Sequence, residues 1–325
     1  MKNSKVEICF IGNAIVDILS KISDEILHKL EVPKGSMQLV DKEVSDKILK
    51  NIKNPTIISG GSAANTAVGF QSFGGKCCFI GQIGNDKFGD LFSKELNNSG
   101  VFFQDQDCQL SEKTSKSIVL VTPDAERSMN TFLGASVKFN INSVNDELIT
   151  NSDMIYVEGY LFDQNDAKEA IYHCFKLAKS NNIKIAFSLS DLFCVDRHRK
   201  EFLHLIHNYV NVIFANESEI KSLYKLNLSE SLNKIKNNVE TGAITLGSKG
   251  SIVFDNKIEH YIDPVHVEDL VDTTGAGDLF ASGFLYGFIN KYSIEKCGLL
   301  GNKSASEIIR YVGARPKISL KSFLN

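Results

Sequence analysis

The chain alternates apolar, strand-like runs with amphipathic helical stretches, and this alternation restricts the fold more than any other feature. The runs "VEICFIG" at 6–12 and "IKIAFSLS" at 183–190 are largely apolar, which is typical of strands buried on both faces. Helical stretches follow such runs, for example 87–100, which Asp86 can cap. We therefore predict an α/β fold: a doubly wound, mostly parallel sheet with helices on both faces.

Two segments, about 19–41 and 101–134, interrupt the alternation. The second contains strand signals at 115–121 and 128–133 on either side of a turn-prone stretch. Strands inserted into an α/β pattern indicate a small sheet outside the main one, and a lid over a site is the expected use. We predict one domain over 1–325 that carries these two lid segments as insertions.

Charge and cysteine usage narrow the class of protein. The 325 residues include 36 basic and 39 acidic side chains, so we expect neither a nucleic acid nor an anionic membrane as a partner. The apolar run at 8–11 is too short for a signal sequence, and no run is as long as a membrane span. The seven cysteines form no C-x-x-C pair, which favours reduced thiols and a cytoplasmic location.

The stretch "VDTTGAGDLF" at 271–280 joins a Gly-Ala-Gly turn to the beginning of a helix. Small residues allow a ligand close to the backbone, and the unpaired amides of a first helical turn attract anions, phosphate above all. Asp278 falls within that turn. Its carboxylate is either a helix cap or a base that removes a proton from a hydroxyl attacking a phosphoryl group.

Two common nucleotide motifs are absent from the sequence. The stretch 69–77, "GFQSFGGKC", misplaces a glycine of the Walker A motif and has Cys77 where Ser or Thr is required. The stretch "GAGDLF" has Phe280 at the third glycine of the Rossmann fingerprint. A bound ATP would therefore be held by loops at the carboxyl ends of the strands.

Four motifs in order resemble the signatures of the ribokinase/PfkB family of sugar and nucleoside kinases, and the resemblance covers essentially the whole chain. The stretch 272–278 has the family pattern D-T-x-G-A-G-D. The stretch 58–90 has its Gly-Gly pair, asparagine and G-x-D-x-x-G. "NESE" at 216–219 has its N-x-x-E, and "TLGSKG" at 245–250 its T-x-G-x-x-G. The resemblance implies a ribokinase-like fold with a small β-sheet lid.

The resemblance also implies catalytic roles. Asp278 is then the catalytic base, and the amides of Gly275, Ala276 and Gly277 form the anion hole. Asp272 would either brace the loop or help to hold a monovalent cation such as K⁺, as in some relatives.

The family's substrate contacts fall on five residues here. Asn65 would contact a sugar hydroxyl, while Gly60 and Gly61 let the substrate approach the backbone. Asp17, which with Asn13 follows the first strand, would accept two hydrogen bonds from a vicinal diol. A polar residue on a helix surface and an aspartate in a turn are the alternatives for Asn65 and Asp17.

The nucleotide and its metal are expected at two further motifs. Asn216 and Glu219 would hold Mg²⁺ through water, although the same spacing also makes a helix-capping pair. Thr245 and Gly247 would border the ATP phosphates and ribose, and Gly250 would form the turn; without the other motifs this would be a hairpin loop.

The lid contributes one charged candidate. Arg127 could reach over a substrate or phosphate when the lid closes, or it is an exposed arginine beside an acidic turn. In this family the lid serves as a dimer clasp or stands alone as a cap, so a monomer and a homodimer through the lid both remain open.

The expected reaction is transfer of the ATP γ-phosphoryl group to a hydroxyl of a small molecule, with Mg²⁺. The stretches 12–18, 60–65 and 126–136 look more like the adenosine-kinase and nucleoside-kinase branch than the phosphofructokinase branch. A ribonucleoside such as adenosine is therefore the first substrate, and a free sugar such as ribose or fructose the alternative. A non-catalytic sensor on the same fold is a further hypothesis, as is an NAD-dependent oxidoreductase, which fits the strand–helix alternation but lacks the fingerprint.

Overall fold

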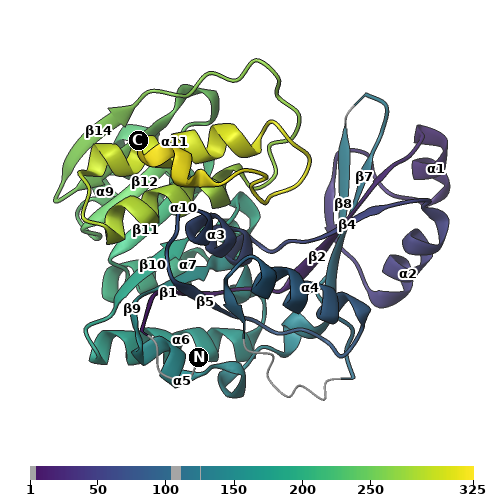
Figure 1. Cartoon of the computed structure of the whole chain (residues 1–325), viewed down its shortest axis with the longest axis horizontal. Coiled ribbons are helices and arrows are strands. Elements are labelled where there is room, and N and C mark those ends of the chain that lie inside the picture. Colours follow the sequence, from purple (N-terminus) through teal and green to yellow (C-terminus); the bar gives the residue numbers. More distant parts are fainter. Residues whose placement is uncertain (1–4, 104–110, 125) are drawn as a thin grey trace.

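The computed structural model describes residues 5–103, 111–124 and 126–325, and within them the predicted α/β fold is confirmed. A nine-stranded sheet forms the large body (Figure 1). From β12 to β6 every pair of neighbouring strands is parallel, whereas β13 and β14 form an antiparallel edge next to β12. In spatial order the strands are β14 (Ile258–Ile262), β13 (Ser251–Asp255), β12 (Thr241–Thr245), β11 (Val212–Asn216), β10 (Lys184–Ser188), β9 (Ser152–Glu158), β1 (Val6–Ile11), β5 (Cys77–Ile80) and β6 (Phe102–Phe103).

The helices cover both faces of this sheet because successive strand residues point to opposite sides. In β1, Ile8 and Phe10 pack into one core and Cys9 and Ile11 into another. The first core is closed by α3 (Ser62–Ser72), α4 (Lys87–Asn98), α10 (Ala276–Ile289) and α11 (Ile294–Ile308). The second is closed by α5 (Asp146–Thr150), α6 (Asn165–Ser180), α7 (Leu192–Asn208), α8 (Glu217–Tyr224) and α9 (Leu228–Ile235).

A second, five-stranded sheet projects from one side of the large body (Figure 1). Its strands, in spatial order, are β3 (Met37–Leu39), β8 (Arg127–Phe132), β7 (Ser115–Val121), β2 (Ile15–Lys21) and β4 (Thr56–Ser59). The helices α1 (Asp24–Lys29) and α2 (Lys42–Asn51) accompany it. On β7, Lys116 pairs with Asp46 of α2, whereas Ser117 lines the cavity described below. One face of the small sheet is thus covered by α2, and the other faces the large body.

The small sheet includes more residues than the first predicted segment, 19–41, and fewer than the second, 101–134. It begins at Ile15 and continues through β4 to Ser59, whereas Phe102–Phe103 pairs with β5 in the large sheet. The strand β2 follows β1 after only three residues and pairs with β7, about 100 residues later, so no local signal marks the boundary. Residues 104–110 and 125 of the second predicted segment lie outside the described residues.

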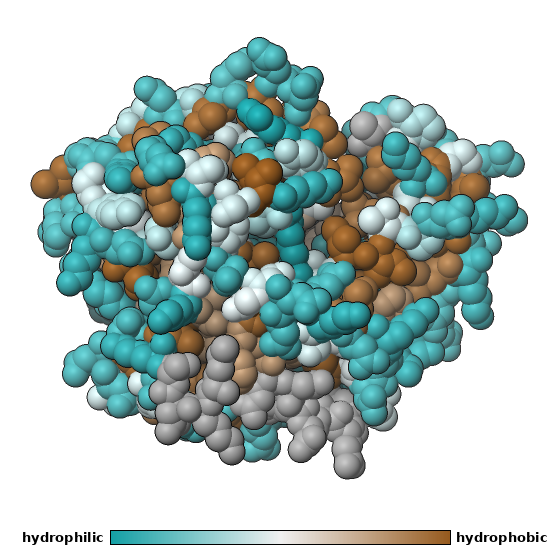
Figure 2. All heavy atoms as spheres, viewed as in Figure 1, coloured by the Kyte–Doolittle hydropathy of each residue, from teal (hydrophilic) through white to brown (hydrophobic). Residues whose placement is uncertain are grey.

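No helix within the described ranges is both long and apolar enough to cross a membrane. Six cysteines lie in these ranges, and all are free and buried: Cys9, Cys77, Cys78, Cys174, Cys194 and Cys297. The surface is hollowed between the large body and the part that contains the small sheet (Figure 2).

Candidate active site

A cavity of about 590 Å³ lies between the carboxyl ends of the large-sheet strands and the inner face of the small sheet. This is the end of a parallel sheet where loops meet and ligands bind. The large body contributes the ends of β1, β9, β10, β11 and β12, with the first turns of α3 and α10. The small sheet contributes Ile15, Asp17, Met37, Leu39, Ser117, Met129 and Thr131.

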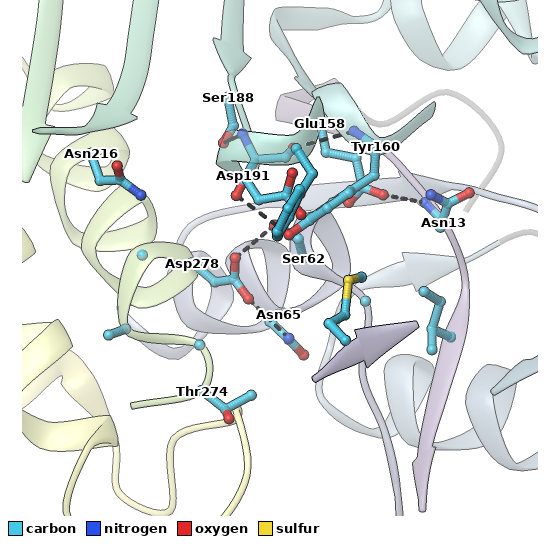
Figure 3. Close-up of a pocket in the computed structure, with 18 of the residues that line it drawn as sticks. Asn13, Ser62, Asn65, Glu158, Tyr160, Ser188, Asp191, Asn216, Thr274 and Asp278 are labelled. Atoms are coloured by element: carbon cyan, nitrogen blue, oxygen red, sulfur yellow. Dashed lines mark hydrogen bonds between the residues drawn. The ribbon is translucent and has the colours of Figure 1, made fainter. Parts of the chain in front are cut away.

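Asp278 lies in the first turn of α10 and points at α3 (Figure 3). Its two carboxylate oxygens accept hydrogen bonds from Ser62 Oγ at 2.6 Å and Asn65 Nδ2 at 3.0 Å. Burial raises the pKa of Asp278 to about 6, and these two donors oppose the increase. The carboxylate is therefore ionised near neutral pH, and it is oriented by another helix rather than used to cap its own. Such a group is suited to accept a proton.

The turn that precedes α10 leaves space beside its amides. Gly275 is the N-cap residue in the left-handed conformation, with φ of 79°. Gly275, Ala276 and Gly277 all line the cavity with Asp278. A Cβ atom built on Gly277 would meet no heavy atom of the described residues within 4 Å. An anion can therefore approach the first-turn amides directly, where the helix dipole favours it.

Asp17 faces the same cavity from β2. Burial raises its pKa to about 7; Arg315 lowers this pKa, while Asp278 and Asp272 raise it. A Cβ atom on Gly60 would lie 2.1 Å from Asp17 Oδ2, so this glycine makes room for the carboxylate. Gly60, predicted to let a substrate approach the backbone, lies outside the cavity lining within the described residues and packs against Asp17.

Asn13 lines the cavity and is fixed through its backbone. Glu158, at the end of β9, is buried and accepts hydrogen bonds from the amides of Asn13, at 2.8 Å, and Ala63, at 2.7 Å. Burial raises the pKa of Glu158 to about 7, against the effect of these two donors. Gly61 also lines the cavity. Glu158 thus ties the loop after β1 to the beginning of α3.

Asn216 and Glu219 form the reciprocal cap of α8 and also line the cavity. The backbone N–H of Asn216 donates to Glu219 Oε2, and the backbone N–H of Glu219 donates to Asn216 Oδ1, both at 2.9 Å. Burial raises the pKa of Glu219 to about 7, and the charge of Asp191 adds to this increase. The capping alternative is therefore observed, and both side chains nevertheless face the cavity.

The T-x-G-x-x-G stretch reaches the cavity only through its threonine. Thr245, at the end of β12, is a lining residue, whereas Gly247 and Gly250 lie outside the lining within the described chain. A Cβ atom on Gly250 would lie 2.2 Å from the Ile262 carbonyl oxygen. Gly250 therefore serves the β12–β13 connection, which must pass close to the end of β14.

Arg127 and Asp272 are brought together beside the cavity. The Arg127 guanidinium forms an ion pair with Asp272 and donates to Thr274 Oγ1 at 2.5 Å. The Asp272 carboxylate, which is fully buried, also accepts from the amides of Thr274 at 2.8 Å and Gly313 at 3.0 Å. Burial alone would raise the pKa of Asp272, but Arg127 and the backbone donors lower it. Strand β8 of the small sheet is thus joined to the loop before α10.

One wall of the cavity was not predicted from the sequence. It is formed at the end of β10 and in the segments after β9 and β10, by Tyr160, Ser188, Ser190, Asp191 and Phe193. Ser190 Oγ accepts a hydrogen bond from the Gly159 amide at 2.7 Å and so joins the two loops. The position of these residues at the ends of "IYVEGY" and "FSLS", or directly after "FSLS", was the available signal, because a ligand site is expected at strand ends.

Within the described residues, no group of three or more His, Cys, Asp or Glu side chains is placed to hold a metal ion.

Comparison with known proteins identifies the family. Residues 35–320 match the pfkB family of carbohydrate kinases. The chain belongs to the pfkB family. It is accordingly an ATP-dependent phosphotransferase that uses a hydroxyl group as acceptor.

Known proteins are similar to this chain over almost its whole length. A probable sugar kinase protein from Rhizobium etli CFN 42 is 38% identical, with a TM-score of 0.92 over 99% of this chain and 98% of that one. The adenosine kinase from Sinorhizobium meliloti is 37% identical, with a TM-score of 0.92 over 99% of both chains. The adenosine kinase from Dictyostelium discoideum is 29% identical over 96% of both sequences.

Proposed function

We propose that this pfkB-family enzyme transfers the γ-phosphoryl group of ATP to a hydroxyl of a ribonucleoside of the adenosine type, with Asp278 as the base. The observation that carries this proposal is the convergence of three groups on one cavity. These are the Asp278 carboxylate, the open first-turn amides of α10 and the Asp17 carboxylate. The names of two relatives, both adenosine kinases, support the nucleoside as acceptor.

The proposed chemistry uses these groups in one step. The Asp278 carboxylate takes the proton from the acceptor hydroxyl as its oxygen attacks the γ-phosphorus atom, and the bond to the ADP oxygen breaks. The amides of Gly275, Ala276 and Gly277 stabilise the negative charge of the transferring group. The Asp17 carboxylate, which lines the same cavity as Asn13 and Asn65, would accept hydrogen bonds from the two ribose hydroxyls.

The small sheet favours a nucleoside over a free sugar because it gives the cavity an apolar side. Met37, Leu39 and Met129 line the cavity from the small sheet, and Leu133 follows β8. Phe193, at the first turn of α7, is 60% exposed although it belongs to the lining. Such a surface offers a flat aromatic base a place to pack, which a free pentose does not need.

We propose Mg-ATP as the phosphoryl donor, with the nucleotide beside Thr245 and Asn216. Glu219 and Asp191 would hold the Mg²⁺ ion through water, and the ion would relieve the repulsion between these two carboxylates. When bound, Mg²⁺ supplies charge neutralisation of the phosphates.

A monovalent cation such as K⁺ at Asp272 would require Arg127 to leave, since Arg127 already neutralises that carboxylate.

A free-sugar kinase is the second candidate, favoured by the relative named as a probable sugar kinase.

We further propose a cytoplasmic enzyme, in keeping with its free thiols. It would act as a monomer with the small sheet as its own cap, because α2 covers the face that a clasp to another subunit would need. A homodimer through the lid is the alternative.

The test is ADP release from Mg-ATP with adenosine, inosine, ribose, fructose and fructose 6-phosphate. We expect turnover with adenosine or inosine, at least 10³-fold lower in Asp278→Asn, and unchanged in Asp166→Asn, a substitution of the same kind at an exposed site on α6. Turnover with ribose or fructose alone would establish the second candidate. If an acceptor raises the melting temperature without ADP release, the protein is a sensor and the proposed function is wrong.

A further inference from the structure

Arg315 lies in the segment that follows α11, and it has no role in the motifs or in the reaction described above. Its side chain is only 15% exposed. Its Nε atom donates to Asn65 Oδ1 at 3.5 Å, and its Nη1 atom lies 3.9 Å from Glu95 Oε2. The guanidinium therefore lies between α3, which carries Asn65, and α4, which carries Glu95.

This guanidinium is buried without a full set of partners. Both contacts are long, and Nη2 is buried with no hydrogen-bond partner in the part of the chain that the structure describes. Burial lowers the pKa of Arg315 to about 10, while the charges of Glu95 and Asp17 oppose the decrease. A buried charge so incompletely paired contributes little to stability, so its position calls for a different explanation.

The contact with Asn65 determines which way that amide faces. A guanidinium only donates hydrogen bonds, so the Asn65 atom turned toward Arg315 must be the oxygen. The amide nitrogen is then turned the other way, toward Asp278 Oδ2, to which it donates at 3.0 Å. If Asn65 were flipped, its oxygen would face the carboxylate and repel it.

The same guanidinium is linked to the small sheet through Glu95. Glu95 Oε2 accepts hydrogen bonds from the amide of Ser59, at 2.9 Å, and from Ser59 Oγ. Ser59 ends β4 and directly precedes Gly60 and Gly61. Arg315 thus contacts both α3 and the α4 residue that holds the end of β4.

We propose that Arg315 is a positioning residue for phosphoryl transfer: it orients the Asn65 amide so that Asn65 donates to the catalytic carboxylate of Asp278. This inference rests on the proposed function, in which Asp278 is the base. It adds a residue from the C-terminal segment, 37 positions beyond Asp278, to the machinery of the reaction.

The first test is Arg315→Met, which keeps much of the side-chain volume and removes the donors. Without Arg315 the Asn65 amide is free to turn, and Asp278 loses a donor that lowers its pKa. We expect kcat to fall about tenfold and the acidic limb of the kcat profile, measured at saturating substrate, to move to higher pH by about half a unit or more. Removing Arg315 also raises the pKa of Asp17, but at saturation the acceptor hydroxyls hold the Asp17 carboxylate, so the limb of kcat follows Asp278. KM for Mg-ATP should stay within about twofold. Arg310→Met, the same substitution at an exposed site, is the matched control and should leave both quantities unchanged.

The second test asks whether Arg315 acts through Asn65. Made together with Asn65→Ala, the Arg315→Met substitution should move the acidic limb no further, because the group it orients is gone. Arg315→Lys, which keeps one charged donor, should recover part of the lost kcat. A limb that stays in place in Arg315→Met, or effects that simply add in the double variant, would show that Arg315 only packs and would overturn the inference.

The failures of the two proposals are distinguishable. If no acceptor in the panel stimulates ADP release by the wild-type enzyme, the proposed function is wrong and this inference fails with it. A wild type that turns over a nucleoside, loses activity in Asp278→Asn and keeps its acidic limb in Arg315→Met overturns the inference alone. Thermal unfolding of each variant, with a single cooperative transition, establishes that a loss of kcat is not a loss of folded protein.

Discussion

Gly275 and Gly277 are two residues apart and have different surroundings. A Cβ atom on Gly275 would lie 2.5 Å from the Ala314 Cβ, and the φ of 79° there disfavours any L side chain. A Cβ atom on Gly277 would stand in open space among the described residues. The first glycine is required by the fold, whereas the second is required only if a ligand occupies that space.

This difference gives a prediction. Gly277→Ala should leave stability within about 0.5 kcal/mol of the wild type, because alanine is favoured in a helix. Its kcat should fall at least about tenfold, since the methyl group would stand where a phosphate approaches the amides. Gly275→Ala should instead lose about 1–3 kcal/mol of stability. Urea unfolding and ADP release measure the two effects, and a Gly277→Ala enzyme with wild-type kcat would contradict an anion hole at this turn.

The residues that sequence analysis identified and those that it missed differ in kind. Asn65, Glu219 and Asp278 each belong to a short contiguous motif whose glycines and spacing carry meaning on their own. Glu158 and Arg315 stand singly in ordinary stretches, and they act on residues 145 and 250 positions away in the chain. Such roles arise only from tertiary contacts, so a sequence read locally contains no signal for them.

At the scale of elements, the Arg127–Asp272 ion pair and the hydrogen bond from Arg127 to Thr274 connect β8 to the loop before α10. Arg127 opens β8, and Asp272 is fully buried. Without the arginine, the Asp272 carboxylate would keep its two backbone donors but lose its counter-charge. A buried carboxylate without its partner is strongly unfavourable.

We therefore expect Arg127→Met to lower the free energy of unfolding by about 1–3 kcal/mol, discounted because the arginine is partly exposed. Arg310→Met, which exchanges an exposed arginine, should stay within about 0.5 kcal/mol of the wild type. Urea unfolding at pH 7 measures both. Equal unfolding midpoints for the two variants would show that the pair does not tie the small sheet to the large body.

The alternation of strands and helices predicted the large body well because each element has its own local pattern. "VEICFIG" became β1, and the stretch that Asp86 was expected to cap became α4 with Asp86 as its N-cap. The small sheet was harder to delimit. Its strands β2 and β7 pair in parallel across almost a hundred residues, and nothing local in either strand names its partner.

At the scale of the whole molecule, four carboxyl groups that are buried or half-buried face one cavity and have raised pKa values. Burial raises the pKa of Asp278 to about 6 and those of Asp17, Glu158 and Glu219 to about 7. A carboxyl group whose pKa is higher in the folded state binds its proton more tightly there. Its contribution to stability is complete below the unfolded pKa, near 4, and is lost as the pH rises through 6 to 7.

The free protein should therefore melt at a higher temperature at pH 5.5 than at pH 8, although phosphoryl transfer requires ionised Asp278. Asp17→Asn, which removes one of these groups, should reduce the difference, whereas Asp166→Asn on the exposed face of α6 should not. Calorimetry across this pH range makes the comparison. A melting temperature that rises steadily from pH 5.5 to pH 8 would contradict the raised pKa values.

The two carboxylates proposed to handle the acceptor belong to different parts of the molecule. Asp17 is carried by β2 of the small sheet and Asp278 by α10 of the large body. Turnover therefore requires an acceptor that contacts both carboxylates at the same time. A molecule that binds only one of them would not be phosphorylated, however tightly it binds. The enzyme can thus discriminate between acceptors by whether they reach both surfaces, and neither surface needs to be selective by itself.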